Sequence, residues 1–174
     1  MTSSAPKDIA TSVRQRLLNQ SKERKDDFNL VLTNFAIERI LARLSQSAYG
    51  DQFVLKGAQL FKVWMGAPHR PTRDLDMLRI GANEIPLIEA IFREVCVLEL
   101  PYRDGIVFDQ STVRGETIRE YGVYQGIRLT VSFSLSGARD NLQIDIGVGD
   151  AVRPVVPLID IGSMLDFPSV KMLS

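Results

Sequence analysis

Cysteine and long apolar runs are what this sequence has least of. It contains a single cysteine, Cys96, which excludes an internal disulfide framework. Because Cys96 lies in an apolar stretch, we interpret it as a core thiol rather than a nucleophile. No apolar run reaches the length of a membrane span, and the first residues carry no apolar signal core. We therefore expect no membrane association and, as the simplest location, the cytoplasm.

The sequence also has no net charge. Its 21 basic and 21 acidic side chains cancel, so the whole chain lacks the electrostatic footprint of a nonspecific nucleic-acid binder, and any RNA contact must be local. Histidine occurs once, as His69, in a proline-flanked loop where we expect an exposed residue rather than a general base. The 174 residues, 45% hydrophobic and 24% charged, suffice for one globular domain with a sizeable core.

Hydrophobic periodicity predicts a mixture of helices and strands. From residue 105 onward short alternating segments dominate. The predicted elements are helices at residues 7–20, 27–46, 58–64 and 84–97, a buried strand at residues 52–56, a strand around residues 74–77, and a hairpin of residues 128–135 with 141–148. Asp26 or Asp27 is expected to cap the second helix. We divide the chain into an N-terminal helical segment, residues 1–50, packed on a core domain, residues 51–174.

Asp74 and Asp76 carry the clearest chemical signal. Side chains alternate faces along a strand, so both carboxylates point one way while Leu75 points into a core. Left unpaired they would repel, whereas a divalent cation relieves the repulsion, and hard oxygen ligands favour Mg²⁺ or Mn²⁺. Asp145 alternates with aliphatic residues in a later strand and is the candidate third ligand. The competing interpretation of each aspartate is a solvent-facing strand residue.

A phosphate site is expected at Lys56, Gly57 and Ala58. Gly57 permits close approach of the backbone to a phosphate, and the helix predicted to begin at Ala58 offers unpaired N–H groups. Lys56 has two interpretations, a phosphate contact or a structural ion pair. Arg73 is a candidate for bidentate hydrogen bonds to phosphate oxygens, or for pairing with the neighbouring aspartates when metal is absent.

The order of these motifs resembles that of polymerase-β-like nucleotidyltransferases, and the chain resembles the AbiEii/AbiGii toxin family more closely. The matching phrases are FVLKGA (residues 53–58), RPTRDLDM (70–77), QIDIGVGD (143–150) and LDFP (165–168). The resemblance implies an α+β fold with a mixed sheet flanked by helices and an N-terminal helical segment. Ala58 stands where the family pattern has a second glycine or a serine. The resemblance also implies that a C-terminal helical part is absent, through natural truncation or because the chain is a fragment.

The resemblance implies a function as well. Such proteins look like toxins of type IV toxin–antitoxin or phage-defence systems that transfer NMP from an NTP to an acceptor such as tRNA. Asp74, Asp76 and Asp145 would be the catalytic metal ligands, with ions about 3.5–4 Å apart as in other two-metal sites. The implied partners are NTP, tRNA or another nucleic-acid acceptor, and a cognate antitoxin; a protein hydroxyl is an alternative acceptor.

Other interpretations remain beside this one. The main alternative is a catalytically degenerate nucleotidyltransferase-like module that acts by binding a protein or a nucleotide. An Asp-x-Asp glycosyltransferase would also explain a metal-held diphosphate, but it generally needs a larger fold. An apolar helix face left uncovered by a missing C-terminal part would favour a homodimer.

Overall fold

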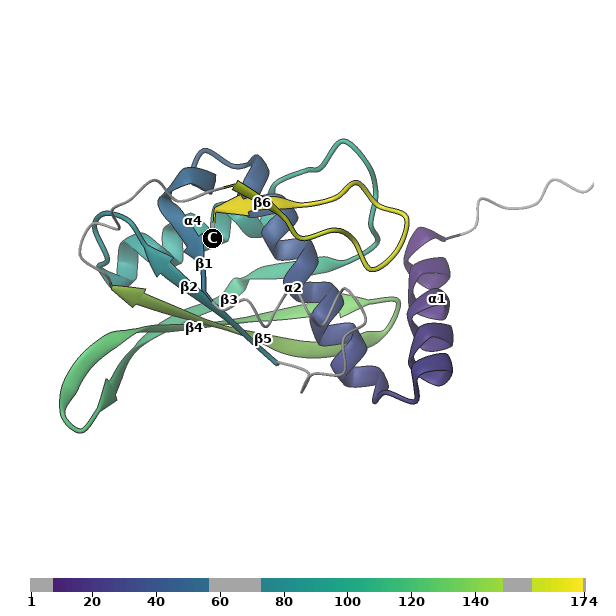
Figure 1. The fold of residues 1–174 in the computed structure, drawn as a ribbon, viewed down its shortest axis with the longest axis horizontal. Helices are drawn as coiled ribbons and strands as arrows, with labels where there is room; N and C mark the ends of the chain where they lie inside the picture. Colours follow the sequence, from purple (N-terminus) through teal and green to yellow (C-terminus); the bar gives the residue numbers. More distant parts are fainter. Residues whose placement is uncertain (1–7, 57–72, 149–157, 174) are drawn as a thin grey trace, which may run out of the picture.

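The fold is built on a single mixed β-sheet that carries helices α2 and α4 on one face (Figure 1). The computed structural model describes residues 8–56, 73–148 and 158–173, so Gly57, Ala58 and the helix predicted at residues 58–64 lie outside the described residues. The described elements are α1 (Ile9–Arg24), α2 (Phe28–Gln46), the short 3₁₀ helix η1 (Gly50–Gln52), β1 (Phe53–Leu55), β2 (Asp74–Arg79), α4 (Ile85–Val97), β3 (Val107–Glu120), β4 (Val123–Leu135), β5 (Ala138–Val148), β6 (Leu158–Asp160) and β7 (Lys171–Leu173).

The described strands form a seven-stranded sheet in the order β3-β4-β5-β2-β1-β7-β6. Strand β2 runs parallel to β5, and β1 runs parallel to β7, while the remaining neighbours are antiparallel. The predicted α+β class, with a mixed sheet, flanking helices and an N-terminal helical segment, is confirmed. Parallel neighbours need a long crossover, and between β2 and β5 the chain forms α4, β3 and β4.

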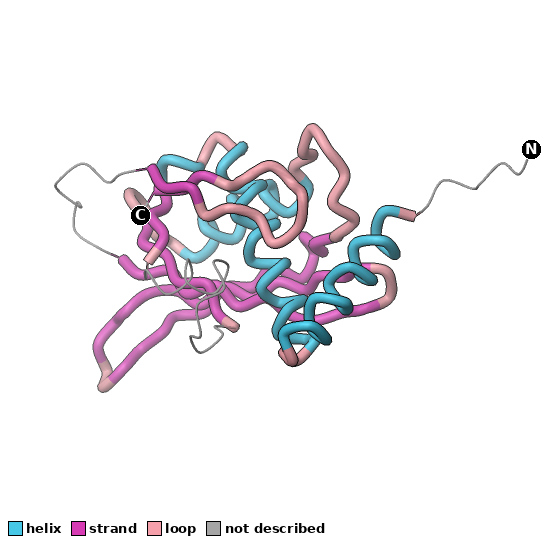
Figure 2. Tube along the Cα trace, turned by 45° about the vertical axis from the view of Figure 1, so that its right-hand side comes forward, coloured by secondary structure: helices cyan, strands magenta, loops and turns pink. Residues whose placement is uncertain are grey.

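The strands after residue 105 are longer than the short segments that the sequence predicts. Strands β3, β4 and β5 contain 14, 13 and 11 residues. Pairing of β3 with β4 includes two register shifts, and each shift interrupts the two-residue alternation, so one strand resembles several in the sequence. Tyr121 and Gly122, both with positive φ, connect β3 to β4 in a tight turn. This end of the hairpin projects beyond the sheet (Figure 2). The predicted hairpin is confirmed as the β4–β5 pair.

The two N-terminal helices differ from prediction mainly at the end of the first. Helix α1 continues past its predicted end at residue 20 as far as Arg24, and the buried Ser21 donates its hydroxyl to the Leu18 carbonyl at 2.8 Å. Lys25 caps the helix after Arg24, and its left-handed conformation closes the last turn. Asp27 caps α2 as predicted, because its carboxylate accepts from the Leu30 amide at 3.1 Å. None of the described helices combines the length and apolar character needed to cross a membrane.

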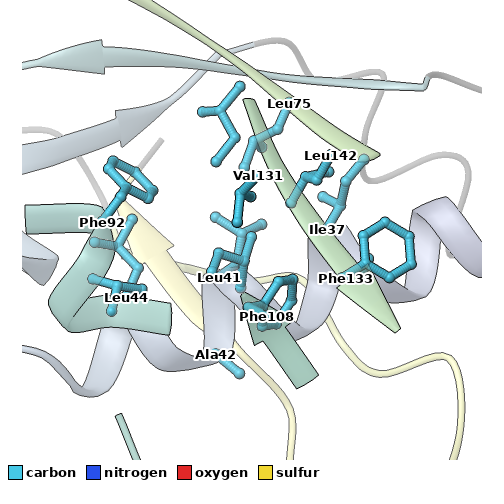
Figure 3. Packing of buried hydrophobic residues seen from close by; sticks show 14 of the residues in the cluster. Ile37, Leu41, Ala42, Leu44, Leu75, Phe92, Phe108, Val131, Phe133 and Leu142 are labelled. Atoms are coloured by element: carbon cyan, nitrogen blue, oxygen red, sulfur yellow. The ribbon is translucent and has the colours of Figure 1, made fainter. Parts of the chain in front are cut away.

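The hydrophobic core lies between the helices and the inner face of the sheet. Figure 3 shows Ile37 and Leu41 of α2 near Leu75 of β2 and Val131 of β4. All four side chains are at most 1% exposed. Among the described residues, the apolar face of α2 is therefore covered by the sheet.

Cys96 is part of this core. Its side chain is buried on α4, and burial raises the pKa of its thiol to about 12. The thiolate, which is the nucleophilic form, is therefore disfavoured at neutral pH. The predicted role of Cys96 as a core thiol is confirmed.

A buried charged cluster attaches the C-terminal segment to α2. The Arg39 guanidinium donates to Glu38 at 2.9 Å and to the Tyr102 hydroxyl at 3.1 Å, and it lies 4.8 Å from the centre of the Phe167 ring. Glu38 also accepts from the Met164 amide at 3.2 Å. Both charged side chains are fully buried, and desolvation raises the pKa of Glu38. The cluster connects the LDFP phrase to the helix that supports the sheet.

Arg39→Met is expected to lower the free energy of unfolding by about 3 kcal/mol, because it leaves the Glu38 carboxylate buried without its cation. The double variant Glu38→Gln/Arg39→Met removes that carboxylate charge and should be less destabilised than Arg39→Met alone. Urea denaturation of the three proteins measures both differences. A double variant that is less stable than the single one would contradict this account of the cluster.

Candidate active site

Strand β2 presents its two aspartates on the face opposite the core. Leu75 and Met77 are fully buried on the inner face, whereas Asp74 is partly exposed and Asp76 is exposed. The predicted alternation is therefore present. The aspartates face outward because the intervening aliphatic side chains fix which side of the strand points into the core.

The parallel pairing of β2 with β5 brings Asp145 to the same place. In this register Asp76 lies opposite Asp145, and Asp74 lies opposite Gln143. Ile144 and Ile146, which flank Asp145, are fully buried on the core side. Side chains that are opposite one another on neighbouring strands share a face, with strands about 4.8 Å apart. Three carboxylates from sequence positions far apart therefore lie together on the outer face.

The electrostatics of the two β2 aspartates reflect this crowding. The pKa of Asp74 is raised, first by partial desolvation and then by the negative charge of Asp145. The pKa of Asp76 is raised by desolvation and by the charges of both Asp145 and Asp74. Neighbouring carboxylates disfavour each other's ionised form, and a cation bound between them removes this repulsion. The cluster thus has the electrostatic character of a cation site.

Arg128 is a site residue that the sequence reasoning did not identify. It lies opposite Asp145 in the β4–β5 pairing and binds it with both ends of its fork: Nε donates to Oδ1 at 2.9 Å and Nη2 donates to Oδ2 at 3.1 Å. With its amide oxygen turned toward Arg128, Gln143 accepts from the same two nitrogens at 3.1 and 3.2 Å. A signal for this pairing was available, because a two-residue turn at Ser136-Gly137 sets the hairpin register that joins residues 128 and 145.

Lys56 follows β1 directly and reaches the same face of the sheet. Its backbone amide donates to the Asp76 carbonyl at 2.9 Å, and its positive charge lowers the pKa of Asp76. Its ammonium lies beside Gly147, where an added Cβ would come within 2.6 Å of Nζ. Glycine at 147 therefore leaves the space that the lysine occupies.

The remaining predicted site residues are placed in part. Arg73 is exposed immediately before β2, and its charge lowers the pKa of Asp74. Gly57 and Ala58 lie outside the described residues, and so does His69, which the sequence predicts to be an exposed loop residue. The site that can be described consists of three carboxylates surrounded by Lys56, Arg73 and Arg128.

The donor set fits a divalent cation in its chemistry. Carboxylate oxygens are the ligands that Mg²⁺ and Mn²⁺ prefer, and these carboxylates repel one another. Among the described residues, however, no three acidic, histidine or cysteine side chains are arranged so as to hold a metal ion directly. In this arrangement both oxygens of Asp145 bind the Arg128 guanidinium.

Comparison with protein families identifies the chain. The family model described as "Nucleotidyl transferase AbiEii toxin, Type IV TA system" matches residues 39–174, from within α2 to the last residue. This chain belongs to the AbiEii family. The match covers β2 and β5, so the three aspartates lie within the AbiEii region, whereas α1 precedes it.

Other comparisons add less to the AbiEii assignment. No curated protein matches the chain. A solved structure described as a "putative nucleotidyltransferase from H. pylori" is similar over 70% of this chain and 46% of its own length, with 15% sequence identity and a TM-score of 0.41. The chain therefore spans less than half the length of that protein. This structural similarity is too low to support any further conclusion about the AbiEii chain.

The raised pKa of Asp76 predicts a pH-dependent effect on stability. A carboxyl whose pKa is raised by folding contributes stability at low pH, and this contribution is lost as the pH rises through the raised value. Asp76→Asn should therefore increase the free energy of unfolding at pH 7 in metal-free buffer, and the increase should shrink as the pH falls toward the ordinary value of 3.8.

Urea denaturation across this pH range tests the expectation, with Asp26→Asn in the exposed α1–α2 loop as the matched control. The control should change stability by no more than about 0.5 kcal/mol. An Asp76→Asn protein that is less stable than wild type at pH 7 would show that the ionised Asp76 carboxylate does not destabilise the folded protein.

Proposed function

We propose that this chain is a metal-dependent nucleotidyltransferase that transfers NMP from an NTP to an acceptor such as tRNA, as the toxin of a type IV toxin–antitoxin system. Membership of the AbiEii family supports the reaction class. The observation that carries the proposal is the parallel register of β2 and β5, which places Asp76 opposite Asp145 with Asp74 close by. Carboxylates gathered on one open face are the ligands that nucleotidyl transfer requires.

In this proposal Asp74, Asp76 and Asp145 hold Mg²⁺ or Mn²⁺. The bound metal would supply the positive charge that stabilises the reacting phosphate and the leaving pyrophosphate. Lys56 lies at the edge of the carboxylate cluster and would bind phosphate oxygens, as would Arg73 at the start of β2. Gly57 and Ala58 are proposed as the phosphate-binding backbone that follows Lys56.

The reaction needs no side-chain nucleophile. The acceptor oxygen forms a bond to the α-phosphorus, the bond from that phosphorus to the bridging oxygen breaks, and pyrophosphate leaves with the electron pair. The acceptor proton passes to solvent. Catalysis then comes from holding the two reactants in line and from neutralising the charge of the triphosphate.

The partners follow from the same proposal. The substrate is an NTP, the acceptor is a nucleic acid such as tRNA, and a cognate antitoxin would control the activity, in the cytoplasm. The proposed division into a helical segment, residues 1–50, and a core domain, residues 51–174, places every residue of the site in the core domain. A homodimer and a role in phage defence are further expectations from the sequence.

The second candidate is a degenerate nucleotidyltransferase-like module that acts by binding. The pairing of Asp145 with Arg128 favours it, because that carboxylate is engaged within the protein. Calorimetric titration of each NTP, with and without Mg²⁺, separates the two candidates. Binding that requires both the metal and the aspartates supports the enzyme, whereas binding that is independent of metal supports the module.

Asp76→Asn is expected to reduce NMP transfer at least about 100-fold. The substitution removes a ligand of the metal that would stabilise the charge on the reacting phosphate. Transfer is measured as pyrophosphate released and as label moved from α-labelled NTP to a tRNA pool. Asp140→Asn is the matched control. Asp140 lies on β5, as Asp145 does, but near the other end of that strand, so this variant should retain activity. Full transfer by a folded Asp76→Asn protein would contradict the proposed function.

A further inference from the structure

Arg128 interacts with every member of the carboxylate cluster, Asp74, Asp76 and Asp145. Its fork binds both oxygens of Asp145 at 2.9 and 3.1 Å and reaches the Gln143 amide oxygen. Its charge also favours the ionised forms of Asp74 and Asp76. One guanidinium on β4, the strand adjacent to β5, therefore binds Asp145 directly and lowers the pKa values of the other two carboxylates.

This guanidinium binds the carboxylate that the proposed function assigns to the metal. A bidentate ion pair engages both oxygens with which Asp145 would bind a metal. The Arg128 and Asp145 side chains are 38% and 21% exposed, so the pair lies at the surface and the arginine can move away without opening the core.

We infer that Arg128 is a built-in counter-ion that a divalent cation must displace from Asp145, so that the resting site has a low affinity for free metal. This inference rests on the proposed function. Arg128 is then a positioning residue: it holds the Asp145 carboxylate in place beside the two β2 aspartates while no metal is bound, and it withdraws when the metal arrives. Its long, flexible side chain and partial exposure allow both positions.

The inference predicts that removing the arginine improves metal binding. Arg128→Gln should bind Mn²⁺ about tenfold more tightly than wild type, because a charge-assisted bidentate pair no longer competes for Asp145. Arg128→Lys keeps the charge but loses the fork, so its Mn²⁺ affinity should lie between the two. Calorimetric titration with Mn²⁺ alone measures all three affinities on the full chain.

Arg114→Gln is the matched control. Arg114 lies on the next strand, β3, and its guanidinium donates to the carbonyls of Ser111 and Val113 on its own strand, at 3.1 and 2.7 Å. The control removes one positive charge near the site without touching the aspartates, so its Mn²⁺ affinity should change less than twofold. An equal gain in both variants would overturn the inference in favour of a diffuse charge effect.

The melting temperature provides a second readout, because a purely structural role of Arg128 would not make the loss of stability reversible by Mn²⁺. Arg128→Gln should lower the melting temperature in metal-free buffer, because the carboxylates lose their counter-ion, and saturating Mn²⁺ should restore it. A folded Arg128→Gln protein with unchanged or weaker Mn²⁺ affinity overturns the inference but leaves the proposed function intact. If neither wild type nor Arg128→Gln binds Mn²⁺, the metal requirement of the proposed function fails as well.

Discussion

The parallel pairing of β2 with β5 is the constraint on which the site depends. Asp76 and Asp145 are opposite one another only in this register, and a slip of one residue would turn one of the carboxylates into the core. The register is held from the other face, where Leu75, Met77 and Ile144 are fully buried. Local sequence cannot enforce such pairing, because the chain builds a helix and two long strands between β2 and β5. The hydrophobic core thus determines the geometry of the candidate active site.

Charge balance is the second feature of the molecule, and it works against stability at the site. Partial desolvation and the neighbouring carboxylates raise the pKa values of Asp74 and Asp76, so their ionised forms lower the stability of the folded protein at neutral pH. Lys56 and Arg128 supply part of the compensating charge from neighbouring strands, and a divalent cation would supply the rest. A site that remains incompletely neutralised in the resting protein is prepared to bind a positively charged ligand.

Much of this arrangement could be predicted from the sequence, because it follows from local rules. The alternation of Asp74, Leu75 and Asp76 fixes their faces, and Asp27 caps its helix through its own side chain. The role of Arg128 was not predicted, because it is set by the register of the β4–β5 hairpin, which pairs Arg128 with Asp145, and not by a sequence motif. The length of β3 was hidden by its register shifts, and α1 extends to Arg24, beyond its predicted end at residue 20.

The central claim is that Asp74, Asp76 and Asp145 form one metal and nucleotide site. A crystal structure of the full chain with Mn²⁺ and a non-hydrolysable NTP analogue tests it most directly, because the anomalous signal of manganese locates the ion independently of the protein density. The account predicts an anomalous peak in contact with the three carboxylates and a triphosphate close to Lys56. Bound nucleotide at another surface, with no manganese at these aspartates, would contradict it.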